Sequence, residues 1–550
     1  MLSQLNHAKR PSLRLRADVP ELQISWVGRL VRPTILTLAA FFVLVGGSNL
    51  DLGPAESRLA LALSEPIGPF GRAFGYWDPS TWPASIGLGQ IWSFFEEEGP
   101  TQGAVRWPSA IAAVLIGVLT ARRVRLAMGS RAGLLVALAW FGSVAAIDRS
   151  GGSSGLDLIT GLGTVAALDR LLGRGSGWVV GFWASFAFLA GGWTPLAVLG
   201  LSTIVLGRSG TTWKWSMTIP IAATVAGWSA WALSAAPAEA WASALGLPIT
   251  QSSAWTLPLT VIGLGLPWAP FAFLARSRKM REGWGESGRP LVMGWLQVAG
   301  ASILVGTIVP GLASAALAPS LVGLAVVSAA CWDRLCVSWP ELPRGVRRGA
   351  IGLTLAAATL WFALVLSWGG YVGFAVAYYR STIIGVALLS LAGFLLALHA
   401  FRKREVLWAL GGLILVSIAI KIAHWGYYVP EWNYRASAGP WGRAIAQWVP
   451  VKHPIYVLHS WPAELAFAMA RPVRQLASPQ HIDFQPGEGS KFVLLQDAEY
   501  AEYQNWSDGW PKLLKVAEFE DEMGLGRRIL TRTDAPLIIR RPYRTHDPRE

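Results

Sequence analysis

Charged residues and cysteines are scarce in this chain of 550 residues. Only 15% of its residues are charged and two are cysteines, whereas 53% are apolar. An average soluble domain carries about 25% charged residues, so the composition excludes a large soluble enzyme. Cys331 and Cys336 are five residues apart with no histidine beside them. They are expected to be reduced, structural thiols rather than a metal site.

The common signatures of soluble catalysis are also missing. No Walker A sequence, no GxGxxG opening a helix and no GxSxG occurs, so a nucleotide-driven pump or a serine hydrolase has no support. The histidines outside the apolar runs are scattered and show no HExxH spacing: His424, His453, His459 and His481. With the low charge content, these absences indicate a membrane protein.

What the chain does contain is a series of apolar runs of roughly 16–22 residues, separated by short basic loops and typical of transmembrane helices. They predict thirteen spans, at about 34–50, 107–121, 131–147, 156–172, 177–192, 194–207, 215–234, 255–275, 290–308, 311–330, 350–368, 382–400 and 406–424. The fold class is therefore predicted to be an α-helical polytopic membrane protein.

The distribution of positive charge predicts the orientation. The net charge is +14, and 26 of the 47 Lys and Arg residues fall in the N-terminal segment and alternate loops, against 5 in the opposite loops. Cytoplasmic loops carry the excess of Lys and Arg, so we expect segment 1–33 in the cytoplasm. The odd number of spans then puts the C-terminal tail outside. The cell (inner) membrane is the expected location.

Two extracytoplasmic segments are too long to be turns. Residues 51–106 form a first loop that mixes apolar and polar positions, as interfacial helices do. Residues 425–550 form a tail, predicted to be an extracytoplasmic α/β domain following the transmembrane domain at 34–424. Its strand-like runs are PIYVLHS, PVRQLA, SKFVLLQD, LLKVAEF and RRILTRT, and its helical pieces are GRAIAQWV and WPAELAFAMA.

Ionisable groups near a bilayer are functional candidates by default. On the outer side the first loop offers Asp51, Glu56 and Asp78, and the second offers Asp148, Arg149 and Asp157. A carboxylate can act as a general base toward an acceptor hydroxyl, and arginines can hold a phosphate. The alternative for each residue is N-capping and solvation. The run Glu96–Glu98 is expected to be a solvated surface.

Several short motifs occur along this architecture. They are Ala55-Glu56-Ser57-Arg58-Leu59-Ala60, Trp77-Asp78-Pro79-Ser80-Thr81-Trp82-Pro83, Arg106-Trp107-Pro108-Ser109-Ala110, Leu156-Asp157, Gly265-Leu266-Pro267-Trp268 and Arg471-Pro472-Val473. With the span pattern, they resemble the GT-C superfamily of membrane glycosyltransferases, in the branch of the protein mannosyltransferases and the lipid A aminoarabinose transferase. The WWDYG-type motif of the oligosaccharyltransferase branch is absent.

The resemblance implies an inverting glycosyltransferase that moves a sugar from a polyprenyl-phosphate donor to a lipid, glycan or protein acceptor on the outer face. It implies Glu56, Asp157 and Asp51 as catalytic carboxylates, and Arg58, Asp78, Arg106 and Arg149 as substrate-binding residues. No metal ligand is assigned, the cofactor is unknown and a divalent metal is left open. No nucleic-acid partner is expected.

Three departures from the family keep other functions open. The first-loop aspartate of the family aligns with Ala55, its lysine has no counterpart before Asp78-Pro79, and its Lys-Gly pair is Gly191-Gly192 here. A catalytically inactive GT-C-like scaffold that binds lipid or partner proteins is therefore the alternative. A transporter or flippase is the third candidate, although no inverted internal repeat supports it.

Overall fold

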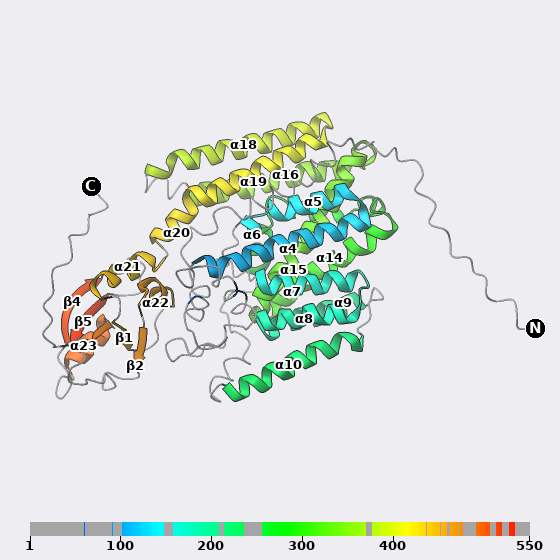
Figure 1. Ribbon diagram of the computed structural model, residues 1–550. Helices are drawn as coiled ribbons and strands as arrows, with labels where there is room; N and C mark the ends of the chain where they lie inside the picture. The colour runs from blue at the N-terminus through cyan, green and yellow to red at the C-terminus, as the bar shows by residue number, and fades with distance from the viewer. Residues whose placement is uncertain are drawn as a thin grey trace, which may run out of the picture.

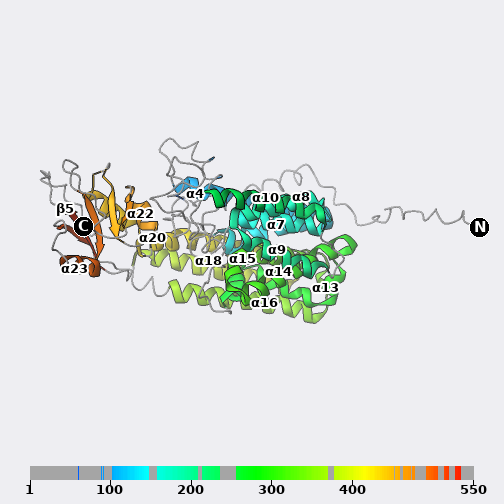
Figure 2. The same cartoon turned by 90° about the horizontal axis from the view of Figure 1, so that it is seen from below.

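The apolar runs fold as helices that pack into a bundle, and the bundle leads at one end into a small mixed sheet (Figure 1). This computed structural model describes residues 60, 88, 91, 102–147, 158–207, 214–235, 256–369, 377–435, 437–450, 453–458, 463–471, 473–476, 491–505, 513–519 and 527–533. The sheet lies beyond the end of the bundle in both views (Figure 2).

The first half of the bundle contains α4 (Gln102–Met128), α5 (Ser130–Phe141), α6 (Val144–Ile147), α7 (Leu158–Leu172), α8 (Gly177–Gly191), α9 (Trp193–Gly207) and α10 (Trp215–Ala235). The second half contains α12 (Thr256–Leu264), η2 (Ala269–Arg276), α13 (Arg278–Glu282), α14 (Gly285–Ile308), η3 (Pro310–Leu312), α15 (Ala313–Ser338), η4 (Trp339–Glu341), α16 (Arg344–Leu364), η5 (Val365–Gly369), η6 (Ala377–Tyr379), α18 (Arg380–Lys403), α19 (Val406–Ala423), η7 (His424–Tyr428) and α20 (Val429–Arg435).

The described helices have the architecture of an integral membrane protein. Among these residues, five helical segments are long and apolar enough to cross a membrane, and a bent pair adds a sixth. The five are Gly285–Ile308, Pro310–Glu341, Arg344–Ser367, Ala377–Lys403 and Val406–Glu431. The total of thirteen spans stays a prediction.

Two spans that the sequence predicts as single helices are broken in the structure. The run 255–275 forms α12 and η2, which meet at an angle of 106°. Pro267 cannot donate a helical hydrogen bond, and Gly265 allows close packing because a Cβ there would lie 3.1 Å from the Val261 carbonyl oxygen. The run 131–147 is interrupted at Gly142 between α5 and α6. Hydropathy remains high through both breaks, so it could not reveal them.

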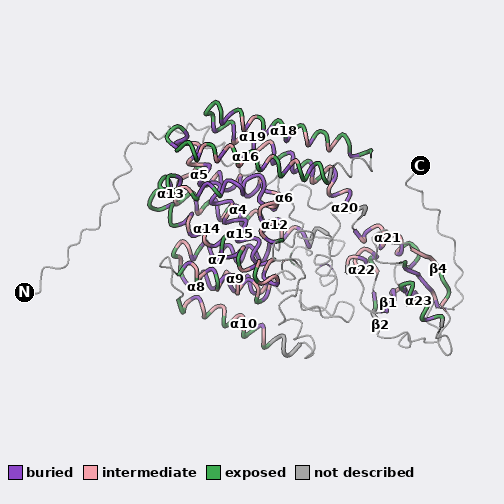
Figure 3. Tube along the Cα trace, turned by 180° about the vertical axis from the view of Figure 1, so that it is seen from behind, coloured by how far each residue is buried: buried purple, intermediate pink, exposed green. Residues whose placement is uncertain are grey.

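Helix α15 is the centre of the bundle. Of its most apolar stretch 83% is buried, against 28% for α16 on the periphery, and Figure 3 shows this contrast between core and outer helices. Its sequence is rich in Ala, Ser and Gly, the small residues that let membrane helices approach closely. A Cβ on Gly323 of α15 would lie 2.7 Å from the Trp295 carbonyl oxygen of α14.

The basic loops gather at one end of the bundle, which we call the loop end. There Arg131 at the start of α5 donates to Asp333 near the end of α15 at 2.6 Å. Ser287 of α14 donates to the Ala127 carbonyl of α4 at 2.7 Å. We call the opposite end, where α4 and α7 begin and α19 leads toward the sheet, the domain end (Figure 1).

The C-terminal sheet has the strand order β2-β1-β3-β5-β4. Its strands are β1 (Ile455–Leu458), β2 (Val473–Leu476), β3 (Phe492–Gln496), β4 (Leu513–Phe519) and β5 (Arg528–Thr533), and its helices are α21 (Gly439–Trp448), α22 (Ala463–Met469) and α23 (Asp497–Asn505). Strand β1 is parallel to β2 and β3, whereas β5 is antiparallel to β3 and β4.

The two faces of the sheet are covered by different helices. Ile455 and Val457 of β1 pack with Ile445 of α21 and Leu465 of α22, while Tyr456 and Leu458 lie in a second cluster with Tyr500 of α23. Alternate residues of a strand point to opposite faces, and parallel strands are normally covered on both. All five predicted strands and both predicted helical pieces are present; α23 was not predicted.

Candidate functional site

Most of the sequence-predicted site residues lie outside the described residues. These are Asp51, Glu56, Arg58, Asp78, Arg149 and Asp157, and their roles stay predictions. In the sequence, two of them are adjacent to described helices of the domain end. Asp157 precedes Leu158, the buried first residue of α7, and Arg149 follows the buried end of α6 at Ile147 by two residues.

Arg106 is the one predicted site residue that the structure describes. It lies in the first turns of α4, at the domain end, and only 5% of it is exposed. A buried guanidinium is costly unless other groups compensate its charge, and Arg106 does have an interaction partner. The structure therefore shows a buried cation at this end of the bundle, while its role in binding stays a prediction.

A second group of charged residues occupies the same end of the bundle and was missed by the sequence analysis. Lys421 and Glu431 are 7% and 6% exposed, and they lie on α19 and α20. His424 and Tyr428 lie between them in η7, with their rings stacked at 5.4 Å between centroids. We call these four residues the polar stripe. Each has an interaction partner.

The sequence signal for the polar stripe was a lysine inside an apolar run, LGGLILVSIAIKIAHW. An ionisable residue in a membrane span is a functional candidate by default, but only residues of the first two outer loops and the family motifs were considered as candidates. The η7 segment is a π-helix, and such wide turns occur frequently at functional sites. Lys421 also has its ammonium 5.8 Å from the centroid of the Trp425 ring.

One tightly packed junction fixes the helix that carries the polar stripe. A Cβ on Gly142 would lie 2.8 Å from the Ser417 hydroxyl oxygen and 2.9 Å from the Trp268 indole nitrogen. The break after α5, the bend after α12 and helix α19 therefore meet at one point. Val144 of α6 also donates to the Leu266 carbonyl at 3.2 Å. Ser417 is one helical turn before Lys421, so this junction fixes the start of the stripe.

The loop end offers a contrast in its electrostatics. Glu282 of α13 is exposed, and hydrogen bonds from Arg278 and Lys279 lower its carboxyl pKa below the usual range. Neighbouring charges within one helix explain this pair as solvated surface structure. Within the described part of the chain, no three His, Cys, Asp or Glu side chains gather in a group that could hold a metal ion.

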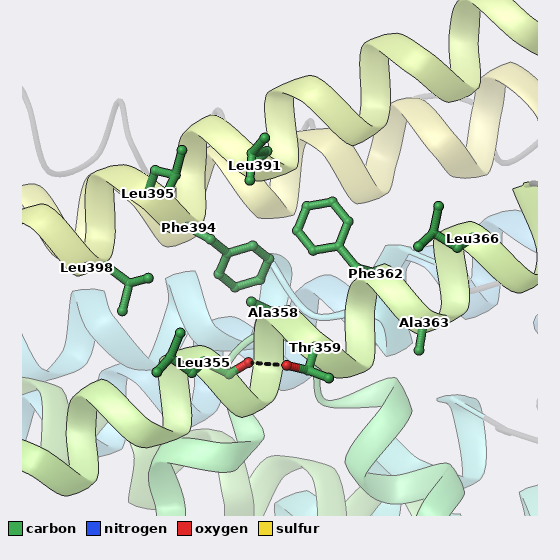
Figure 4. A pocket seen from close by; sticks show the side chains of 10 residues that line it. All are labelled: Leu355, Ala358, Thr359, Phe362, Ala363, Leu366, Leu391, Phe394, Leu395 and Leu398. Carbon is green, nitrogen blue, oxygen red and sulfur yellow. Dashed lines mark hydrogen bonds between the residues drawn. The ribbon is translucent and has the colours of Figure 1, made fainter.

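An apolar groove of about 560 Å³ lies between α16 and α18, with Phe362 and Phe394 at its centre (Figure 4). Thr359 is its one side chain with a hydroxyl, and that hydroxyl donates to the Leu355 carbonyl at 3.0 Å. The groove thus offers no free polar group for a phosphate or a sugar. Three buried charged side chains, those of Arg106, Lys421 and Glu431, lie instead at the domain end.

Neither family models nor curated proteins match the chain, but solved structures do. ArnT from Cupriavidus metallidurans in the apo state matches with a TM-score of 0.67 at 17% identity, over 92% of this chain and 98% of ArnT. The same protein bound to undecaprenyl phosphate matches with a TM-score of 0.67 at 16% identity, over 93% and 99%. The chain has the fold of ArnT. The resemblance to the GT-C transferases is confirmed at the level of the fold.

Proposed function

We propose that this protein transfers a sugar from a polyprenyl-phosphate donor to an acceptor on the extracytoplasmic face of the cell membrane. The observation that carries the proposal is the ArnT fold over nearly the whole chain, since one of these ArnT structures holds undecaprenyl phosphate. The buried Arg106 at the domain end supports it, because a phosphate needs a cation in a site that excludes water.

The proposed topology places segment 1–33 in the cytoplasm, the transmembrane domain at 34–424 and the α/β domain at 425–550 outside. The basic residues at the loop end support this orientation. The domain end is then extracytoplasmic, and the donor's lipid tail lies among the helices.

In the proposed reaction, the acceptor hydroxyl attacks the anomeric carbon with inversion. The bond from that carbon to the phosphate oxygen breaks, and polyprenyl phosphate leaves with the electron pair. A carboxylate accepts the hydroxyl proton, and its candidates are Asp157, Glu56 and Asp51. Arg58, Arg106 and Arg149 are proposed to neutralise the phosphate, and Asp78 to contact the substrate. A divalent metal stays open.

The departures at Ala55 and at Gly191-Gly192 favour a second candidate, an inactive scaffold of this fold that binds lipid or partner proteins. Turnover by the wild-type protein separates the two. The full-length protein in lipid nanodiscs is given a panel of polyprenyl-phosphate pentoses and hexoses, and release of polyprenyl phosphate is measured. If no member of the panel is consumed, the scaffold becomes the leading function.

Single substitutions then test the proposed roles. Asp157→Asn should lower the rate about 100-fold or more, as loss of a general base or of an essential electrostatic partner does. Loss with Glu56→Gln but not with Asp51→Asn would assign the base to Glu56. Glu286→Gln, an exposed carboxylate at the loop end, is the matched control and should keep the wild-type rate. Wild-type turnover in Asp157→Asn would contradict the proposed mechanism.

A further inference from the structure

The polar stripe contains two charged side chains at buried positions where apolar side chains would cost less free energy of folding. Lys421 and Glu431 are each more than nine-tenths buried. Replacing buried ionic groups by well-packed apolar ones is often neutral or even stabilising, so stability alone does not explain a buried lysine and a buried glutamate here. Charged groups in such positions commonly mark substrate or ion sites in membrane proteins.

The stripe lies at the depth of a lipid headgroup. Lys421 follows the start of α19 at Val406 by 15 residues, which is about 22 Å along a helix. Arg402, Lys403 and Arg404 mark the polar boundary at the loop end, and the hydrocarbon core is about 30 Å thick. Lys421 therefore lies about 8 Å inside the opposite boundary, and Glu431, about 15 Å further along the continuous helix α19–η7–α20, lies about 7 Å beyond it.

The stripe therefore extends across the membrane boundary toward the C-terminal domain. Its four residues are spaced by three, four and three positions, so that side chains on successive turns are neighbours. A lysine ammonium is a compact charge suited to phosphate. A carboxylate accepts hydrogen bonds from sugar hydroxyls or from an amino group. Lys421 lies nearer the membrane centre and Glu431 lies further out. This order matches a lipid-linked sugar, whose phosphate is nearer the membrane than its sugar.

We infer that the polar stripe grips the head of a polyprenyl-phosphate sugar, with Lys421 against the phosphate and Glu431 against the sugar. The inference rests on the proposed function and adds a binding site to it. Lys421 holds the phosphate in both the donor and the spent polyprenyl phosphate, whereas Glu431 contacts the donor alone. Affinity for the two lipids therefore depends on the two residues differently.

The experiment measures binding of sugar-free polyprenyl phosphate to the full-length protein in nanodiscs, with no turnover required. Lys421→Met should weaken binding at least 10-fold, while Lys421→Arg should stay within about 3-fold of wild type because it keeps the charge. Glu431→Gln should leave this affinity unchanged but weaken binding of the sugar-linked donor. Lys403→Met, the same change at the exposed end of α18, is the matched control and should bind as wild type.

A second measurement uses only the wild-type chain, in case a variant fails to fold. A photoreactive diazirine placed beside the phosphate of polyprenyl phosphate should label the peptide that contains residues 421–431. Unlabelled polyprenyl phosphate should compete. Equal competition by phosphatidylglycerol or inorganic phosphate would overturn the polyprenyl assignment, because it would show a general phosphate site.

Unchanged binding in Lys421→Met, or labelling confined to other segments, would overturn the inference. Sugar transfer by the wild type would still uphold the proposed function in that case. If the wild-type protein binds no polyprenyl phosphate at all, both fail.

Discussion

Gly393 of α18 and Gly412 of α19 bring the backbones of two membrane helices into contact. A Cβ on Gly393 would lie 2.7 Å from the Gly412 carbonyl oxygen, and a Cβ on Gly412 would lie 2.9 Å from the Ala397 amide nitrogen. Small residues at such crossings let membrane helices pack closely, where van der Waals contact is a main driving force. The contact joins the helix that carries Lys421 to its neighbour.

This crossing gives a matched pair of substitutions at adjacent positions. Gly412→Ala should destabilise the protein by about 1–3 kcal/mol through overpacking. Gly411→Ala meets no atom within 4 Å, so it should be neutral or stabilise by up to about 1 kcal/mol through helix propensity. Thermal unfolding of the two variants in the same detergent checks this. Equal stability of both variants would mean that α18 and α19 are not packed at Gly412.

A buried hydrogen bond joins α16 to α18. The Trp361 indole N–H donates to the Ser390 hydroxyl at 2.9 Å. Ser390→Ala leaves that N–H buried without its acceptor and should cost about 1–3 kcal/mol. Adding Trp361→Phe removes the orphaned donor, so the double variant should lose less than the sum of the single losses. Strict additivity in this thermodynamic cycle would contradict the bond.

Alkaline pH should weaken the C-terminal domain through Tyr503. Burial raises the pKa of Tyr503 to about 12, above the value of about 10 for an unfolded tyrosine. The folded state then retains a proton that the unfolded state loses. Stability from this group is therefore complete below about pH 10 and decreases as the pH rises toward 12.

The difference between two variants measures this effect. Tyr503→Phe should show a smaller loss of thermal stability between pH 9 and pH 11 than the wild type, whereas Tyr378→Phe, at a tyrosine that is 82% exposed, should behave as the wild type. Identical pH profiles for wild type and Tyr503→Phe would contradict a buried phenol.

The orientation of the chain is open to a direct test. Alkaline phosphatase, which is active only outside the cytoplasm, should be active when fused after residue 550, and a fluorescent protein that matures only in the cytoplasm should stay dark there. The reason is the excess of basic residues in loops assigned to the cytoplasm, 26 against 5. A bright cytoplasmic signal would remove both the topology and the proposed side of the active site.

The sequence was most informative where apolar runs have clear limits. Each strand of the C-terminal sheet is such a run between polar residues, and all five were predicted. Helix α23 was missed because its sequence, DAEYAEYQN, has no apolar periodicity and is held by contacts with β3 and β5. The breaks at Gly142 and near Pro267 were missed because hydropathy reports depth in the membrane and not the direction of the backbone.

The candidate site was harder to predict, because it depends on which charges the fold buries. Arg106 was identified through a family motif, and the structure shows that it is buried. Lys421 and Glu431 have no motif, and they lie on helices placed by distant contacts: α19 packs on α6 and on the Gly142–Trp268 junction, and α20 contacts α21. Such long-range packing is not encoded in any local pattern.

The last membrane helix continues through η7 into α20, and α20 contacts α21 of the C-terminal domain. This continuous helix is packed tightly at Ser417, one turn before Lys421, whereas Glu431 is close to the point where the helix joins the domain. A tilt of the domain would therefore bend the helix at its wide π turn and change the separation of the two charges. Tilting of the C-terminal domain would then open or close the proposed binding site between Lys421 and Glu431.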